Sequence, residues 1–311
     1  MDGKQLQTQY KEHLSDFNNW NQKEHAEDFI LYPKNIGYHL CIDETALSKG
    51  ELYTILTNRD KHGRKGTIVA IVKGTKAEDV INVLLKIDAD KRNQVKEITL
   101  DMAGSMQKIA KRCFPGAMQV VDRFHVSKLV YEAVQDLRIA YRWQVMKDEN
   151  RKIKEAKAKG ESYEPKVFGN GDTLRQLLAR SRYLLFKAPD KWLQIQNVRA
   201  KLLYEQIPDI KSVYYYALRL GKIFSDYTDK DVARAKLALW YNEIEEFGYD
   251  TFTTVANSIE NHYERILNYF VNRSTNAAAE AFNAKIKAFR ASFRGVVDKR
   301  FFLYRLAKVY A

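Results

Sequence analysis

Residues 96–122 read KEITLDMAGSMQKIAKRCFPGAMQVVD, and their pattern is the clearest indication of the fold class. Its first part, Lys96–Asp101, has the length and apolar content of a strand and ends in a carboxylate. Ser105–Phe114 has helical spacing, and Pro115–Gly116 ends that helix. Met118–Asp122 is a further strand that again ends in a carboxylate. A strand, a helix and a strand in this order favour parallel strands joined by a crossover helix.

Three strand-like runs precede this unit, at Gly37–Asp43, Glu51–Asn58 and Thr67–Lys73. Arg59–Gly66, which joins the second run to the third, has the glycines and charges of a hairpin loop. We therefore expect these strands to be antiparallel neighbours. Three antiparallel strands that lead into a βαβαβ pattern have the order of a ribonuclease-H-like α/β fold, a mixed sheet with flanking helices.

The first crossover helix is predicted between the third strand and Lys96. Thr75 and Glu78 have the spacing of a capping box, in which two side chains satisfy N–H groups at a helix start. Apolar residues then recur at helical spacing, at Val80, Val83, Leu84 and Ile87. A helix with one buried face is expected here.

The rest of the chain divides by its sequence pattern into further segments. Residues 1–35 form a polar, weakly helical N-terminal segment, and residues 36–125 contain the strands of the α/β core. Residues 126–272 lose the strand pattern and show helical periodicity, so an all-helical insertion is expected. Residues 273–311 supply the final helices of the core.

The composition is that of a globular protein with a strong positive charge. Lys and Arg outnumber Asp and Glu by 52 to 39, a formal charge of +13 over 311 residues. This surplus favours a polyanionic partner, although a merely basic soluble protein has the same balance.

Cys41 and Cys113 are too few for a disulfide framework or a four-cysteine zinc site. The start has no signal-peptide core and no apolar run approaches ~20 residues, so a cytoplasmic protein without a membrane partner is expected.

Two strand ends carry candidate catalytic acids. Asp43 closes the first predicted strand and Asp101 the fourth, and these strands are neighbours in a ribonuclease-H-like sheet. Converging carboxylates repel unless cations neutralise them, and their hard oxygen atoms favour Mg²⁺ or Mn²⁺. Two such ions about 4 Å apart can activate water or a 3′-hydroxyl against a phosphodiester. The alternative is that the two aspartates are unrelated surface residues.

The segment 274–295, STNAAAEAFNAKIKAFRASFRG, predicts a helix that Ser274 can cap. Its core face is expected to carry Phe282, Ile286, Phe289 and Phe293. The spacing of three and four places on another face Asn276, Glu280, Asn283, Lys287, Arg290 and Arg294. A single acid among amides and bases suits a metal ligand flanked by phosphate contacts, and a charged solvent face is the alternative.

Three motifs resemble the DDE transposases of bacterial insertion sequences, most closely the ISL3 group and more distantly the Mutator-like transposases. They are CIDET at residues 41–45, the block from Thr99 to Val126 and the segment 274–295. The similarity covers nearly everything from about residue 36 onward, and the helical insertion is matched only in character.

The resemblance implies an enzyme that cuts double-stranded DNA at transposon ends and joins the 3′-hydroxyl to target DNA. It assigns the metal-binding triad to Asp43, Asp101 and Glu280, with two Mg²⁺ or Mn²⁺ ions as cofactors. It also implies phosphate contacts from the basic residues of the last helices. Transposases generally work as multimers on paired ends, so a homo-oligomer on DNA, associated with the bacterial nucleoid when active, is expected.

The Asp-x-x-His motif of Asp122 and His125 lies beside the site in the relatives. A role in supporting the metal ligands or positioning DNA is favoured over direct ligation, and a structural histidine is a further alternative. Glu44 is expected on the other face of the strand from Asp43, away from the site.

Full-length relatives carry a zinc-binding and helix-turn-helix region that recognises the element's ends, and its cysteines are absent here. Either the chain is truncated or a separately encoded protein supplies end recognition, and we expect the separately encoded protein. Two other functions stay open. A ribonuclease-H-like nuclease or resolvase would cut without joining, and a transposase-derived accessory protein would bind DNA without catalysis.

The partner hypothesis predicts that the isolated chain binds DNA with little preference for a terminal inverted repeat. Its basic residues contact phosphates, and such contacts weaken steeply with salt and carry little sequence information. Binding of the chain to terminal-repeat and scrambled duplexes across a salt series measures this. A tight, salt-resistant preference for one repeat would contradict it.

Overall fold

The computed structural model describes residues 3–48, 50–248, 250–293 and 296–311. The chain forms two compact units. The first consists of the chain up to Asp122 together with Glu264–Ala311, and the second is Arg123–Tyr263. The first unit contains the sheet, and the second is built from helices.

The sheet has six strands in the order β1-β4-β3-β2-β5-β6. β1, β4, β3 and β2 pair antiparallel, whereas β2, β5 and β6 pair parallel. This mixed pairing confirms the predicted ribonuclease-H-like α/β fold. In chain order the strands are β1 (Phe29–Leu31), β2 (His39–Ser48), β3 (Glu51–Asn58), β4 (Ile68–Lys73), β5 (Glu97–Leu100) and β6 (Met118–Val121).

Strand β2 is longer than the sequence predicts. Its parallel pairing with β5 ends at Cys41↔Thr99, two residues before Asp43 and Asp101. Its antiparallel pairing with β3 continues through Asp43↔Ile55 as far as Ser48. The prediction that Asp43 closes its strand was therefore wrong, because β3 goes on pairing with β2 after β5 has ended. Asp43 nevertheless lies just beyond the point where the two parallel strands separate.

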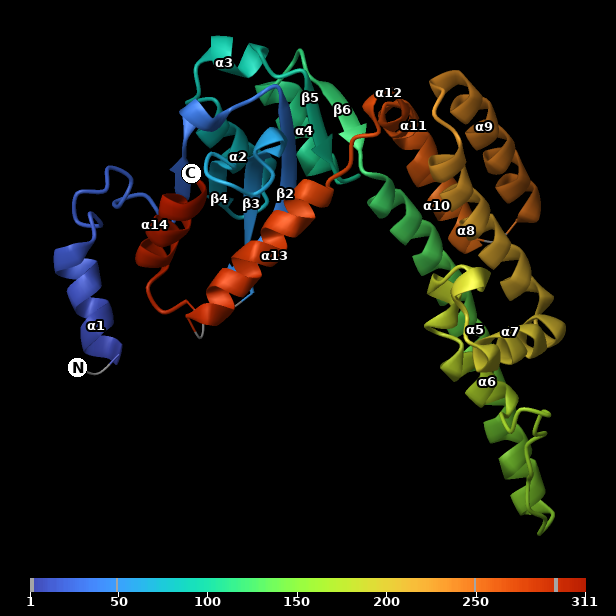
Figure 1. Cartoon of the computed structure of the whole chain (residues 1–311). Coiled ribbons are helices and arrows are strands. Elements are labelled where there is room, and N and C mark those ends of the chain that lie inside the picture. The colour runs from blue at the N-terminus through green and yellow to red at the C-terminus, as the bar shows by residue number, and fades with distance from the viewer. Residues whose placement is uncertain (1–2, 49, 249, 294–295) are drawn as a thin grey trace. The chain divides into compact units, whose positions relative to one another are not determined.

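Helices cover both faces of the sheet, with α13 and α14 on one face and α2 and α4 on the other (Figure 1). The helical elements of the first unit are α1 (Gly3–Gln9), the π-helix η1 (Tyr10–Leu14), the 3-10 turns η2 (Pro33–Asn35) and η3 (Arg59–Lys61), α2 (Ala77–Leu84), α3 (Ala89–Asn93), α4 (Gly104–Cys113), α12 (Tyr269–Asn272), α13 (Ala277–Ser292) and α14 (Lys299–Tyr310). Helix α11 (Tyr263–Leu267) begins at the unit boundary.

Two predicted helix caps were wrong. Helix α2 has Lys76 at its N-cap with no side-chain cap, and Glu78 instead forms an ion pair with Lys108 of α4. Helix α13 has Asn276, not Ser274, at its N-cap. Ser274 instead forms a hydrogen bond with Glu97 of β5. Glu78 and Ser274 thus contact distant parts of the fold, and the local spacing of residues does not reveal such contacts.

The N-terminal segment contains strand β1, which the sequence analysis does not anticipate. Ile30 of this strand is fully buried and pairs with Ile71. Further upstream, Phe17 packs edge-to-face on Phe301 of α14, with ring centroids 5.2 Å apart. Aromatic burial therefore attaches this otherwise polar segment to the core.

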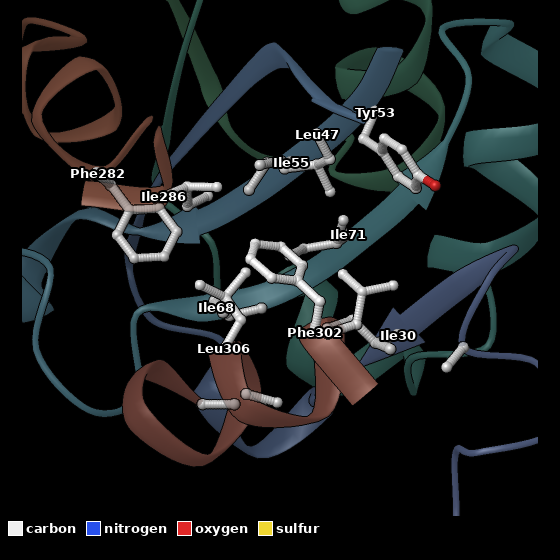
Figure 2. Close-up of a cluster of buried hydrophobic side chains, with 14 residues drawn as sticks. Ile30, Leu47, Tyr53, Ile55, Ile68, Ile71, Phe282, Ile286, Phe302 and Leu306 are labelled. Atoms are coloured by element: carbon white, nitrogen blue, oxygen red, sulfur yellow. The ribbon is translucent and has the colours of Figure 1, made fainter. Parts of the chain in front are cut away.

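Helices α13 and α14 close one face of the sheet with apolar side chains, as Figure 2 shows. Phe282 and Ile286 of α13 are buried in a cluster with Ile55, Ile68 and Ile71. Phe289 and Phe293 pack against this cluster and are partly buried. The predicted core face of the helix is confirmed, and its burial fixes which way the remaining faces of α13 point.

The second unit is helical over the residues that the structure describes, apart from one isolated bridge between Val167 and Thr173. Its elements are α5 (Arg123–Ala158), α6 (Leu174–Arg180), the 3-10 turns η4 (Leu184–Phe186) and η5 (Pro189–Lys191), α7 (Gln194–Gln206), α8 (Pro208–Asp226), α9 (Lys230–Phe247) and α10 (Asp250–Asn261). Across the described ranges, no helix has the length and apolar character needed to span a membrane.

Replacing Ile286 with alanine tests the packing of α13. The side chain is 1% exposed, so its loss should lower the free energy of unfolding by about 2–5 kcal/mol. Urea unfolding of the whole chain measures the change. Lys287→Ala, at the next and exposed position, is the control and should change it by no more than about 0.5 kcal/mol. Equal effects of the two changes would contradict this packing.

Candidate metal centre

Helix α13 is fixed to β2 by a hydrogen bond at Asp43. Asn283, which is 8% exposed, donates its Nδ2–H to Asp43 Oδ2 at 2.7 Å. The other carboxylate oxygen of Asp43 accepts the backbone N–H of Glu44 at 2.8 Å. Each oxygen thus accepts a donor, which fixes the orientation of the carboxylate and leaves it further lone pairs.

Glu280 lies about one helical turn before Asn283 and is exposed. Asp122, which directly follows β6, is 1% exposed. A carboxylate oxygen of Glu280 lies within 4.8 Å of one of Asp122. Two carboxylates this close repel each other unless a proton or a cation lies between them, so the pair is suited to a divalent ion.

Asp101 follows β5 and is half-buried. Its Oδ1 accepts the backbone N–H of Ala103 at 2.7 Å, just before α4 begins. Among the described residues, Asp43, Asp101 and Glu280 do not form a group with ligand atoms within 4.8 Å of one another. Glu280 thus lies beside Asp122, whereas Asp43 lies on β2 and Asp101 directly follows the neighbouring strand β5.

Glu44 belongs to the same electrostatic environment, although strand alternation predicts it on the other face. Burial raises the pKa of Glu44, and the charges of Asp101 and Asp43 raise it further. Sequence reasoning missed this residue because it considered only the face of the strand. The acidic pair in the CIDET motif was the available signal. The site thus holds more negative charge than the predicted triad alone.

A buried glutamate fixes the chain that leads into α13. Glu97 of β5 is 1% exposed and accepts hydrogen bonds from Arg59 Nη1 at 2.6 Å and from Asn272 Nδ2 at 2.8 Å. Burial by itself would raise the pKa of Glu97. Hydrogen bonds from Asn272 and Ser274 and the charge of Arg59 outweigh it and hold the pKa below its usual value. The only sequence signal for this role is a charged residue in an apolar strand.

The predicted polar stripe of α13 lies at the edge of its buried face. Asn276 is fully buried and neither side-chain amide atom has a hydrogen-bond partner. Lys287 is exposed and Arg290 is half-exposed. Arg294 lies outside the described residues. The two asparagines thus face the protein, and the acid and the bases lie toward solvent.

His125, the second residue of the Asp-x-x-His motif, lies in the first turn of α5. This helix belongs to the second unit. The side chain is half-buried, and its Nε2 atom is buried without a hydrogen-bond partner. An unpaired imidazole nitrogen is compatible with a ligand or positioning role, and with a structural one.

The comparisons with known proteins place these residues in one family. The family model for ISL3-type DDE transposases, described as "Transposase", matches residues 40–306. This range contains the three motifs from which the resemblance was inferred, and it spans both units. A search of curated proteins found no match.

Replacing Glu97 with glutamine should remove a pH-dependent part of the stability. The folded-state pKa is lowered, so the carboxylate stabilises the fold above its unfolded pKa of about 4.3, and this contribution is lost as pH falls through the lower folded value. At pH 7 the variant should lose about 1.5–3 kcal/mol in the free energy of unfolding.

Urea unfolding of both proteins between pH 7 and pH 3 tests this, and the difference should shrink toward the acid end. The exposed Glu161→Gln is the control and should leave the profile unchanged. A difference for Glu97→Gln that stays constant over the whole pH range would contradict the assignment.

Proposed function

The chain belongs to the ISL3 family of DDE transposases, and we propose that it cleaves DNA at transposon ends and joins the 3′-hydroxyl to target DNA. Membership of the family makes it an enzyme that acts on DNA and uses divalent metal. The observation that carries the finer proposal is the position of α13, which brings Glu280 beside Asp122 and pairs Asn283 with Asp43.

The donor set fits Mg²⁺ or Mn²⁺. It consists of carboxylates, the hard oxygen ligands that these ions prefer, and the Asp122–Glu280 pair concentrates negative charge at short range. We propose that Asp43, Asp101 and Glu280 hold two ions and that Asp122 supports them from beside Glu280. The ions would supply Lewis-acid activation of water or the 3′-hydroxyl and stabilise the leaving oxygen.

The chain's own residues keep the carboxylates in place for this chemistry. The Asn283 amide holds Asp43, and the Ala103 N–H holds Asp101. Asn272, hydrogen-bonded to Glu97, positions the start of α13 and with it Glu280. Positions fixed before the reaction lower the reorganisation that the transition state requires.

DNA contacts are proposed for the exposed part of α13. Lys287 lies about two helical turns after Glu280 and is exposed, and Arg290 is half-exposed, so both can reach phosphates that flank the carboxylates. Asn283 is instead proposed to position Asp43. A separately encoded end-recognition protein and a homo-oligomer on DNA remain proposals that rest on the family likeness.

The site assignment predicts loss of catalysis when a single carboxylate is neutralised. Asp43→Asn and Glu280→Gln should each lower the rate of DNA cleavage by at least about 100-fold, because the ions lose a ligand. The substrate is DNA that carries the sequences flanking the chain's own gene, assayed with Mg²⁺ or Mn²⁺ for cut ends and for joined products.

Asp79→Asn, an exposed acid on α2, is the control and should leave the rate unchanged. Calorimetric titration with Mn²⁺ provides a readout that needs no DNA, and both site variants should bind the ion more weakly. Full cleavage and joining by either variant would contradict the assignment. Cutting without joined products would instead favour a nuclease or resolvase.

A further inference from the structure

The second unit contains an open cavity of about 750 Å³, and its lining shares no residue with the candidate metal centre. Helix α5 contributes one wall, and the chain from the end of α6 to η4 contributes the other. The lining includes three arginines and three aromatic residues: Arg138, Arg142, Arg182, Trp143, Tyr183 and Phe186.

Positive charge is concentrated in this cavity. Arg138 is 4% exposed and is held by Gln135 Oε1 at 2.7 Å and by the Leu178 carbonyl at 2.9 Å. Burial lowers the pKa of Arg138, and the charges of Arg142 and Arg182 lower it further. In the described part of the chain, none of the three arginines forms an ion pair with a carboxylate.

Two acids also line the cavity, but they do not neutralise it. Glu132 faces Lys128 at 3.7 Å, which leaves Asp136 to balance three guanidinium groups. The Nε–H of Arg142 is buried and has no hydrogen-bond partner. A buried donor without an acceptor costs stability, so a ligand that supplies an acceptor would be favoured here.

The aromatic residues at this cavity are unusually open to solvent. Trp143 is 56% exposed and Tyr183 is 68% exposed, whereas Trp240 and Tyr214 of the same unit are fully buried. The guanidinium of Arg182 lies over the Tyr183 ring, 5.4 Å from its centroid. The Phe186 ring packs against the Tyr131 ring, with the two ring centroids 6.0 Å apart.

We propose that this cavity binds an unpaired nucleobase of DNA together with its flanking phosphate. Exposed aromatic faces and arginine planes stack on bases, and guanidinium groups pair with phosphate. Base faces are covered by stacking in an intact duplex, so the ligand is a single strand or a base that has left the helix. The site would give the helical insertion a contact with DNA that does not depend on catalysis at the carboxylates.

Binding of the whole chain to a fluorescently labelled dT₁₂ oligonucleotide tests the proposal, with EDTA present so that metal binding does not contribute. The wild type should bind dT₁₂ more tightly than an abasic oligonucleotide of the same length, because only dT₁₂ offers bases to stack. Trp143→Ala should weaken binding to dT₁₂ by about 5- to 150-fold, the effect of losing one stacked base. Tyr183→Ala, at a more exposed position, should act in the same direction and keeps the test valid if Trp143→Ala does not fold.

Two controls separate stacking from charge. A twelve-residue abasic oligonucleotide offers only phosphates, so Trp143→Ala should leave its affinity unchanged. Arg142→Gln should lower the affinity for both oligonucleotides. Arg151 is an exposed arginine farther along α5, and Arg151→Gln should lower neither affinity by more than about threefold. No effect of both aromatic variants on dT₁₂, or an equal loss of affinity for dT₁₂ and for the abasic oligonucleotide in these variants, would overturn the proposal. The oligonucleotide binding does not depend on the carboxylates of the metal centre. The cavity proposal and the proposed catalysis can therefore be contradicted independently of each other.

Discussion

The hydrogen bond from Asn283 to Asp43 joins residues 240 positions apart in the chain, and the candidate site depends on it. Asp43 belongs to the strand that pairs with both halves of the sheet, and Asn283 belongs to the helix that carries Glu280. The apolar cluster around Phe282 and Ile286 presses that helix onto the sheet, and Glu97 fixes the chain before it through Asn272. Apolar burial supplies the binding energy of the helix, and the two polar contacts fix its position and rotation.

This arrangement gathers like charges. Glu280 lies next to Asp122, and the pKa of Glu44 responds to both Asp43 and Asp101. A fold that holds these carboxylates together loses electrostatic stability unless cations are present. Such a cost at a strand end is typical of a functional site. The chain belongs to a transposase family, and we propose that this negative charge binds the divalent metal.

Much of the fold could be predicted from the sequence because it depends on local patterns. The apolar runs and their turns predicted every strand except β1, and the spacing of Phe282 and Ile286 predicted the buried face of α13. The caps were missed because Glu78 and Ser274 contact distant partners. The length of β2 was missed because pairing with β3 prolongs it. Glu97 and the role of Asn283 depend on contacts between residues far apart in the chain, and no local periodicity encodes such contacts. The sequence indicated that Asp43 and Asp101 lie near strand ends and that Glu280 lies on a helix. It did not indicate which of the site's carboxylates lie close together.

The location of bound metal would show whether the carboxylates beside α13 form the metal centre. Crystals of the chain soaked in Mn²⁺ and measured at a wavelength where manganese scatters anomalously would show which side chains hold the ion. Anomalous density is expected in contact with Glu280 and with at least one of Asp43, Asp101 and Asp122. Manganese held only by acids outside this group, with the carboxylates next to α13 left without an ion at saturating concentration, would contradict it.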